Sequence, residues 1–322
     1  MALSLVVLVA YLGFIGFEGS QAFGAHDRAG DCRTPESAFG WAYEAINYDL
    51  ASDSQLDAYP DRTDCPETGE PAGPDLLASD GVRIAGWYIP AGKAGKAAPT
   101  IVLAHADGKD KSQMLAWAKP LHADYNLVLF DFRNHGQSSG STTTLGVREV
   151  LDLQAVIDWL DRTKSPTSIA VLGVSMGGAT AIDEAATDTR VEALILDSTH
   201  ATLVSALQAQ LESRGFPLAL PGAWSILLGG LLRTGEDLSL ADPVEAMSHI
   251  GDRPVLIVAG GQDHAVGPSD AADLMKAAQE DGVKAELKTC PGAGHGMSVE
   301  TCSADYAGWV LGFLERSLPH KP

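Results

Sequence analysis

The sequence predicts a doubly wound α/β fold with a mostly parallel sheet. Short apolar runs of strand length recur along the chain, at residues 100–104, 127–130, 169–172, 193–196 and 255–259. Segments with helical periodicity separate several of these runs, at residues 146–160, 177–186 and 269–279. This alternation is typical of buried parallel strands joined by crossover helices. Because such crossovers are right-handed, the carboxyl ends of the strands share one edge of the sheet, where ligand sites form.

The segments outside this alternation predict the domain organisation. Residues 80–90 alternate polar and apolar side chains around a turn, which predicts an antiparallel edge strand or hairpin at the start of a catalytic domain over residues 80–322. Residues 23–79 are rich in Asp, Pro, Gly and Ser and predict an irregular extension. At about residues 200–252 the alternation breaks, and the apolar stretch 216–232 predicts a short helical lid. An ordinary crossover with a longer helix pair is the alternative.

The amino-terminal residues and the cysteines both predict an extracytoplasmic protein, secreted or held at the membrane. Residues 1–17 contain no charged side chain, which predicts a signal peptide or a membrane anchor within residues 1–22. A buried amino-terminal helix is the alternative. The four cysteines form two local pairs, and an even number in this context predicts disulfides, with four unpaired thiols as the alternative. The pairs are Cys32 with Cys65 and Cys290 with Cys302.

The charge and the motif content exclude several classes of partner. With 42 acidic and 22 basic side chains, the chain has a formal net charge of −20. Such a charge repels phosphate backbones and anionic lipid surfaces, so we expect no nucleic-acid partner. The cysteine and histidine spacings fit no metal motif, and the glycine-rich strings lack the P-loop lysine and the dinucleotide pattern. We therefore expect neither a metal nor a cofactor.

The most specific motif is Gly-Val-Ser-Met-Gly at residues 173–177, between an apolar run and a helical segment. Gly-x-Ser-x-Gly in this context is the pattern of a nucleophile elbow. Small residues are needed on both sides because the strained turn brings neighbouring backbones close together. The helix that follows favours developing negative charge at its amino end. Ser175 is therefore the predicted nucleophile.

A serine nucleophile needs a base and an acid that orients the base. Asp263 follows an apolar run in Gly-Gly-Gln-Asp, and His295 lies in Pro-Gly-Ala-Gly-His-Gly after a further predicted strand. Serine, aspartate and histidine thus occur in the chain order expected of α/β-hydrolases. We predict that His295 is the base and Asp263 the acid. Asp197, directly after another apolar run, is an alternative acid, and His264 is an alternative base.

An oxyanion hole needs two backbone N–H donors. Met176 supplies one by its position after the nucleophile. The second is expected from the loop His-Ala-Asp-Gly at residues 105–108, which follows the apolar run 100–104. We predict the N–H of Asp107 as this donor, with Ala106 as the alternative.

These residues resemble the α/β-hydrolases of the serine-esterase and lipase type, near the membrane-anchored hydrolases that share a catalytic-domain pattern with prolyl-oligopeptidase-like enzymes. The resemblance covers about residues 80–318 and includes Asp-Phe-Arg-Asn-His-Gly-Gln-Ser-Ser-Gly at residues 131–140. That segment is similar to the family's turn after its fourth strand, whose role is largely structural. Two positions depart from the family: His105-Ala106 stands where His-Gly is usual, and Arg133-Asn134 where Arg-Gly is usual.

The resemblance implies an α/β-hydrolase fold and the hydrolysis of a small-molecule or lipidic ester through an acyl-enzyme. A peptidase, an amidase or an acyltransferase could use the same triad. A non-catalytic binding protein is the alternative from another class. The sequence predicts no oligomeric state.

Overall fold

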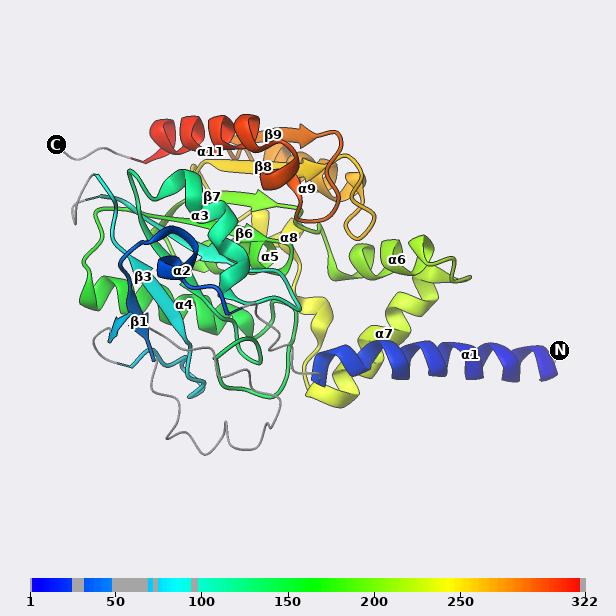
Figure 1. The fold of residues 1–322 in the computed structure, drawn as a ribbon. Helices are drawn as coiled ribbons and strands as arrows, with labels where there is room; N and C mark the ends of the chain where they lie inside the picture. Colours follow the sequence, from blue (N-terminus) through cyan, green and yellow to red (C-terminus); the bar gives the residue numbers. More distant parts are fainter. Residues whose placement is uncertain (1, 25–31, 48–68, 72–74, 94–97, 319–322) are drawn as a thin grey trace.

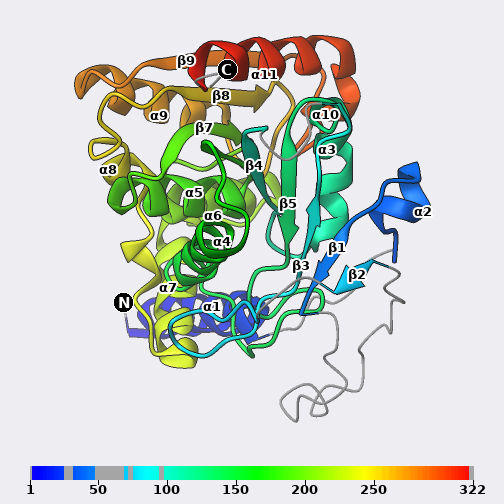
Figure 2. The same ribbon diagram turned by 90° about the vertical axis from the view of Figure 1, so that its left-hand side faces the viewer.

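The sheet of the computed structural model has nine strands in the order β2-β1-β3-β5-β4-β6-β7-β8-β9 (Figures 1 and 2). The structure describes residues 2–24, 32–47, 69–71, 75–93 and 98–318. The strands are β1 Glu44–Ile46, β2 Glu70–Pro71, β3 Gly86–Ile89, β4 Thr100–Ala104, β5 Asn126–Phe130, β6 Ile169–Val174, β7 Val191–Asp197, β8 Val255–Gly260 and β9 Ala285–Cys290. From β5 to β9 all neighbours are parallel, whereas β3 is antiparallel to both β1 and β5.

Helices cover both faces of this sheet. The helices of the described residues are α1 Ala2–Ser20, α2 Pro35–Phe39, α3 Leu115–Leu121, α4 Glu149–Thr163, α5 Met176–Thr187, α6 Leu203–Ser213, α7 Ala219–Thr234, α8 Pro243–Met247, α9 Pro268–Glu280, α10 Ser298–Thr301 and α11 Ser303–Ser317, of which α1, α6 and α7 lie to one side of the sheet (Figure 1). The short 3₁₀ helices are η1 Gln21–Gly24, η3 Lys111–Met114 and η4 Leu238–Leu240. Alternate strand residues form two separate cores, one beneath α4, α5 and α9 and the other beneath α3 and α11. This two-sided burial explains why the central strands are continuous apolar runs.

The predicted fold class is confirmed, because the five apolar runs form β4 to β8 and the three periodic segments lie in α4, α5 and α9. Residues 80–90 contain the antiparallel strand β3, as predicted, but β3 does not lie at the edge, because β1 and β2 continue the sheet beyond it. These two strands come from the extension that was expected to be irregular. β1 has three residues and β2 has two, too few for a periodic signal, and β1 is held by its pairing with β3.

The region of the predicted lid folds as α6 and α7, followed by η4 and α8. Helix α1 lies beside α7 in both views (Figures 1 and 2). The side chain of Ile15 on α1 is buried and lies next to Gly222 of α7. The Tyr11 hydroxyl donates to the carbonyl of Pro217, 2.7 Å away, at the amino end of α7. The amino-terminal helix is therefore packed against the lid along one side, while most of its apolar side chains are exposed, unlike those of a buried helix.

A buried ion-pair network fixes the turn after β5. Arg133 donates to both carboxylate oxygens of Asp152 on α4 and reaches Asp80 at 2.7 Å. Asp152 is fully buried and the Arg133 side chain is 4% exposed. Asp131 in the same turn is buried, and its carboxylate lies 2.7 Å from the ammonium of Lys111 on η3. The segment that resembles the family's turn is thus structural in this protein.

We expect Arg133→Ala to lower the free energy of unfolding by about 3–5 kcal/mol, because it leaves the buried Asp152 carboxylate without its cation. The matched control is Arg316→Ala, whose partner Glu286 is 2.8 Å away on the exposed surface. An exposed pair of this kind contributes below about 1 kcal/mol. Urea unfolding of both variants measures the difference, and equal losses would contradict the role given to the buried network.

Candidate active site

Ser175 lies at the sharp turn between β6 and α5. Its backbone has φ 55° and ψ −118°, a conformation that L residues rarely adopt. Glycine is required on both sides of Ser175 because other backbone atoms lie too close for a side chain. A Cβ on Gly173 would lie 2.3 Å from the backbone of Gly177, and one on Gly177 would lie 2.3 Å from the carbonyl oxygen of Ala104. The turn therefore needs the Gly-x-Ser-x-Gly pattern, and it lifts the serine above the carboxyl edge of the sheet.

The structure brings Ser175, His295 and Asp263 together. The Nε2 atom of His295 is 2.9 Å from the Ser175 hydroxyl, and its Nδ1 atom is 2.8 Å from the Asp263 carboxylate. Asp263 follows β8, and its other carboxylate oxygen accepts the backbone N–H groups of Ala265 and Val266, both at 2.9 Å. These two bonds orient the acid, which is buried, while the imidazole is 30% exposed. This arrangement can transfer a proton from serine to histidine.

The rival acid and base do not join this chain of hydrogen bonds. Asp197 is buried at the end of β7, where its carboxylate accepts from the Trp117 indole at 3.0 Å and from the Ser198 hydroxyl at 3.2 Å. Burial raises the pKa of Asp197 to about 6, although these hydrogen bonds oppose the rise. His264 is exposed to solvent beside Asp263. The Ser198 hydroxyl also accepts the backbone N–H of Gly296, at 3.0 Å. The residues that follow β7 therefore help to hold the loop that carries His295.

The second predicted donor of the oxyanion hole must be an N–H group of the loop at residues 105–108 that has no other hydrogen-bond partner. The N–H of Ala106 donates to the Gln113 side chain at 3.0 Å, so it is already occupied. Within the part of the chain that the structure describes, the N–H of Asp107 makes no hydrogen bond. Asp107 and Met176 both line the cavity that contains Ser175. The departure from the usual His-Gly does not strain this loop, because Ala106 has no positive φ here.

Two buried histidines hold this loop. His105 accepts the backbone N–H of Phe132 at 3.0 Å and contacts the carbonyl of Ala106 at 2.7 Å through its other ring nitrogen. The Nε2 atom of His135 accepts the N–H of Gly108 at 3.2 Å. The loop is thus held in place by hydrogen bonds to the turn after β5. Backbone N–H groups that bind an oxyanion need such a fixed position.

A cavity of about 240 Å³ opens above Ser175. Its apolar lining comes from the lid helices, from the end of α1 and η1, and from the loops before α4 and after β8. The residues of this lining are Gly19, Ala22, Phe23, Leu145, Leu203, Ala206, Leu207, Leu211, Ile226 and Val266. The polar lining apart from the triad, Met176 and Asp107 is His200, Gln210 and Arg214. Sequence reasoning missed the contribution of α1 to this cavity, because helix periodicity does not identify the packing partner.

His200 is the other residue that sequence reasoning missed. It lies just beyond the carboxyl end of β7. Ligand sites of parallel sheets form at the carboxyl ends of the strands, so this position in the sequence could have identified it. Its side chain is 4% exposed, and its Nε2 atom has no hydrogen-bond partner among the described residues. Burial, and then the nearby charge of His295, lower the pKa of His200 to about 4. A neutral imidazole is therefore held in the cavity wall.

The fold and the serine turn are those of an α/β hydrolase. Residues 101–309 match the model of the Alpha/beta hydrolase family, and the chain belongs to this family. It is 29% identical over 230 residues to the Uncharacterized protein Rv2307c of Mycobacterium tuberculosis, covering 70% of this chain and 73% of that protein.

Solved structures show the same fold. The esterase Pf2001 of Pyrococcus furiosus superposes with a TM-score of 0.68 at 20% identity, covering 92% of this chain and 99% of that one. The acylaminoacyl peptidase of Pyrococcus horikoshii superposes with a TM-score of 0.61 at 17% identity, covering 79% of this chain and 42% of that one. At these identities the likeness establishes the architecture alone.

The disulfide between Cys290 and Cys302 encloses the loop that carries His295. Cys32 is also disulfide-bonded, while Cys65, its predicted partner, lies outside the described residues. Every cysteine that the structure describes is thus oxidised, as the sequence predicts.

We expect the double variant Cys290→Ser with Cys302→Ser to lose about 3 kcal/mol in the free energy of unfolding, because the unfolded chain regains the entropy of a loop of this size. Urea unfolding under oxidising conditions measures the loss. Reduction of the wild type would also break the bond of Cys32, so the double variant is the cleaner comparison. Unchanged stability of the double variant would exclude a structural role for the bridge.

The buried His200 predicts a loss of stability in acid. An unfolded histidine has a pKa of about 6.5, and the folded value is about 4. Below pH 6.5 the unfolded chain therefore binds a proton that the folded chain does not, and stability falls as the pH drops towards 4. Between pH 7 and pH 5, His200→Leu should lose about 2 kcal/mol less than the wild type.

The comparison across two pH values removes any constant effect of the substitution on packing. His249→Leu, at an exposed histidine, is the matched control and should follow the wild type. An equal acid-induced loss in His200→Leu and the wild type would show that His200 is not kept neutral by the fold.

Proposed function

We propose that the protein is a serine carboxylesterase with Ser175 as nucleophile, His295 as base and Asp263 as acid. The observation that carries this proposal is the continuous hydrogen-bond chain from Ser175 through His295 to Asp263, at the floor of a mostly apolar cavity. A structural serine would need neither the strained turn nor a histidine aligned on its hydroxyl.

In this mechanism the Ser175 oxygen attacks the ester carbonyl while His295 accepts the serine proton, and Asp263 stabilises the resulting imidazolium. The N–H groups of Met176 and Asp107 bind the oxyanion of the tetrahedral intermediate. When the intermediate collapses, His295 returns the proton to the departing alcohol and leaves an acyl-serine. Water then attacks this ester, with His295 again as base, and releases the carboxylic acid and the free enzyme.

The size and the lining of the cavity favour a small apolar acyl group. A volume of about 240 Å³ is below the roughly 300–1,000 Å³ of sites for drug-sized ligands. The apolar side chains of α6 and α7 in this wall suit the hydrocarbon part of an acyl group. We also propose an extracytoplasmic location, because the cysteines are oxidised and α1 is apolar.

The proposal is tested with purified full-length protein and p-nitrophenyl esters from acetate to palmitate, beside a chromogenic peptide amide. We expect turnover with a short-chain optimum. Ser175→Ala and His295→Ala should each lower kcat by about 10³-fold or more, because the triad acts as a unit. Asp263→Asn should cost more than Asp197→Asn, which leaves the triad hydrogen bonds intact.

His264→Ala is the matched control for the base, since it removes the neighbouring histidine that lies outside the triad, and it should retain wild-type turnover. Preference for the amide would assign the protein to the peptidases. Acyl transfer to an added alcohol in place of hydrolysis would assign it to the acyltransferases. Folded protein that turns over no ester or amide would support the binding role instead.

A further inference from the structure

Helix α1 is apolar on every side. From Ala2 to Phe17 it contains no charged residue, and the side chains that point away from the protein are between 60% and 63% exposed. They are Leu5, Val6, Val7, Val9, Phe14 and Phe17. Successive helix positions differ by about 100°, so Leu5, Val6 and Val7 face three directions. A helix that is apolar all round belongs in a protein core or in a bilayer, and this one projects from the molecule (Figure 1).

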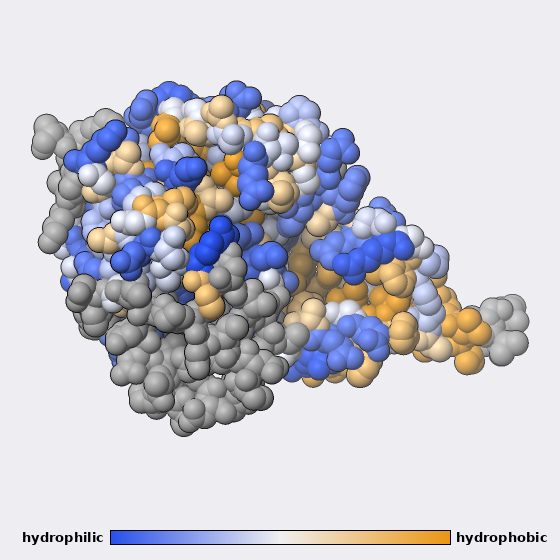
Figure 3. Space-filling model, viewed as in Figure 1, coloured by the Kyte–Doolittle hydropathy of each residue, from blue (hydrophilic) through white to orange (hydrophobic). Residues whose placement is uncertain are grey.

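The exposed face of α7 continues this surface. Its outward side chains are between 39% and 80% exposed, and they form an apolar area that joins that of α1 (Figure 3). They are Leu220, Trp224, Leu228, Leu231 and Leu232. Charged residues of the two helices lie near their carboxyl ends, at Glu18 and Arg233. The surface is therefore apolar from the tip of α1 towards the catalytic domain.

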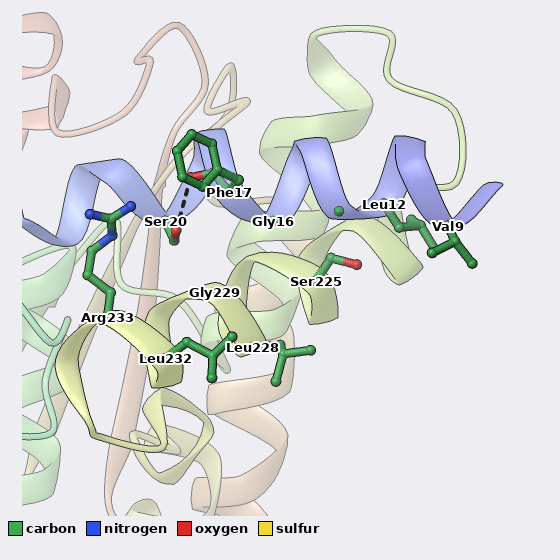
Figure 4. A pocket seen from close by; sticks show the side chains of 11 residues that line it. Val9, Leu12, Gly16, Phe17, Ser20, Ser225, Leu228, Gly229, Leu232 and Arg233 are labelled. Atoms are coloured by element: carbon green, nitrogen blue, oxygen red, sulfur yellow. Dashed lines mark hydrogen bonds between the residues drawn. The ribbon is translucent and has the colours of Figure 1, made fainter. Parts of the chain in front are cut away.

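Glycines let the two helices touch backbone to backbone (Figure 4). A Cβ on Gly16 would lie 2.5 Å from the carbonyl oxygen of Ser225, and one on Gly229 would lie 2.4 Å from that of Gly16. Packing through small residues is typical of helix pairs in membranes. An apolar groove of about 620 Å³ runs between the helices, lined by Val9, Leu12, Phe17, Leu228 and Leu232 among others.

The same contact closes the catalytic cavity. Gly19 at the end of α1 packs on Ile226, where a Cβ would lie 2.6 Å from that side chain. Gly19, Ile226 and Phe23 all line the cavity above Ser175. Removal of α1 as a cleaved signal would therefore open this wall.

We propose that α1 and the exposed face of α7 enter a lipid bilayer as one unit, with the groove between them filled by acyl chains. The 19 residues of α1 are about 28 Å long, close to the roughly 30 Å of hydrocarbon in a bilayer. A second copy of the chain would cover one stripe of α1, whereas lipid covers all its sides. Among the described residues, the segment Leu5–Gly24 alone has the length and composition to cross a membrane.

The test measures lipid contact at Trp224. Of the six tryptophans, Trp224 alone is exposed, at 52%, and it lies on the proposed lipid-facing side of α7. The full chain is reconstituted into phosphatidylcholine vesicles, with or without brominated acyl chains that quench tryptophan on contact. We expect brominated lipid to quench the emission of the wild type, and Trp224→Phe to remove most of this quenching.

Anchoring by α1 alone would leave both proteins unquenched on vesicles that carry them, and this result would overturn the proposal for α7. Leu228→Asp with Leu232→Asp should lower the quenching of Trp224, because charges on this face resist entry into lipid. Leu287→Asp, at an exposed leucine of β9, is the matched control. Shielding of Trp224 from both bromolipid and aqueous acrylamide, with a dimeric mass, would assign the surface to a second copy instead. None of these measurements depends on catalysis, so a failure of the lipid proposal can be distinguished from a failure of the proposed esterase activity.

Discussion

The close approach of backbones around Ser175 is the constraint on which the rest of the site depends. A non-glycine residue at φ 55° carries strain of about 1–3 kcal/mol, which persists where the surroundings fix the turn. Here β6 is hydrogen-bonded on both sides by β4 and β7, and α5 begins directly at Met176. Gly173 and Gly177 remove the side chains that would push these elements apart. Without them the serine could not stand above the sheet edge.

The strand order then brings Asp263 and His295, the proposed acid and base, to that serine. β7 and β8 follow β6 in the sheet, and β9 follows β8. Asp263 and His295 come from the loops after β8 and β9, so they reach Ser175 from one side. The hydrogen bond from the Gly296 N–H to the Ser198 hydroxyl connects the loop that carries His295 to the end of β7. The disulfide between Cys290 and Cys302 joins the two ends of this loop. The imidazole is thereby held from both ends of its loop.

The sequence predicts those features whose cause is local. β4 to β8 are recognisable because two-sided burial requires continuous apolar runs, and the serine turn is recognisable because its geometry needs glycine at fixed positions. β1 and β2 were missed because strands of two or three residues depend on a partner strand and have no period of their own. The roles of His200 and Gly19 depend on packing between segments far apart in the chain, which no local pattern records.

The acidic composition is compatible with apolar helices at the surface, because the charged side chains lie outside their apolar stretches. A net charge of −20 opposes approach to an anionic surface, but the stretch from Ala2 to Phe17 and the outward face of α7 carry none of it. Attachment through these helices therefore depends on buried apolar area, which salt does not screen. Because the same helices form part of the cavity wall above Ser175, a movement of these helices in the proposed lipid-bound state would also change the volume of this cavity. The proposed anchoring and the proposed selection of the acyl group thus depend on the same contacts, centred on the packing of Gly19 against Ile226.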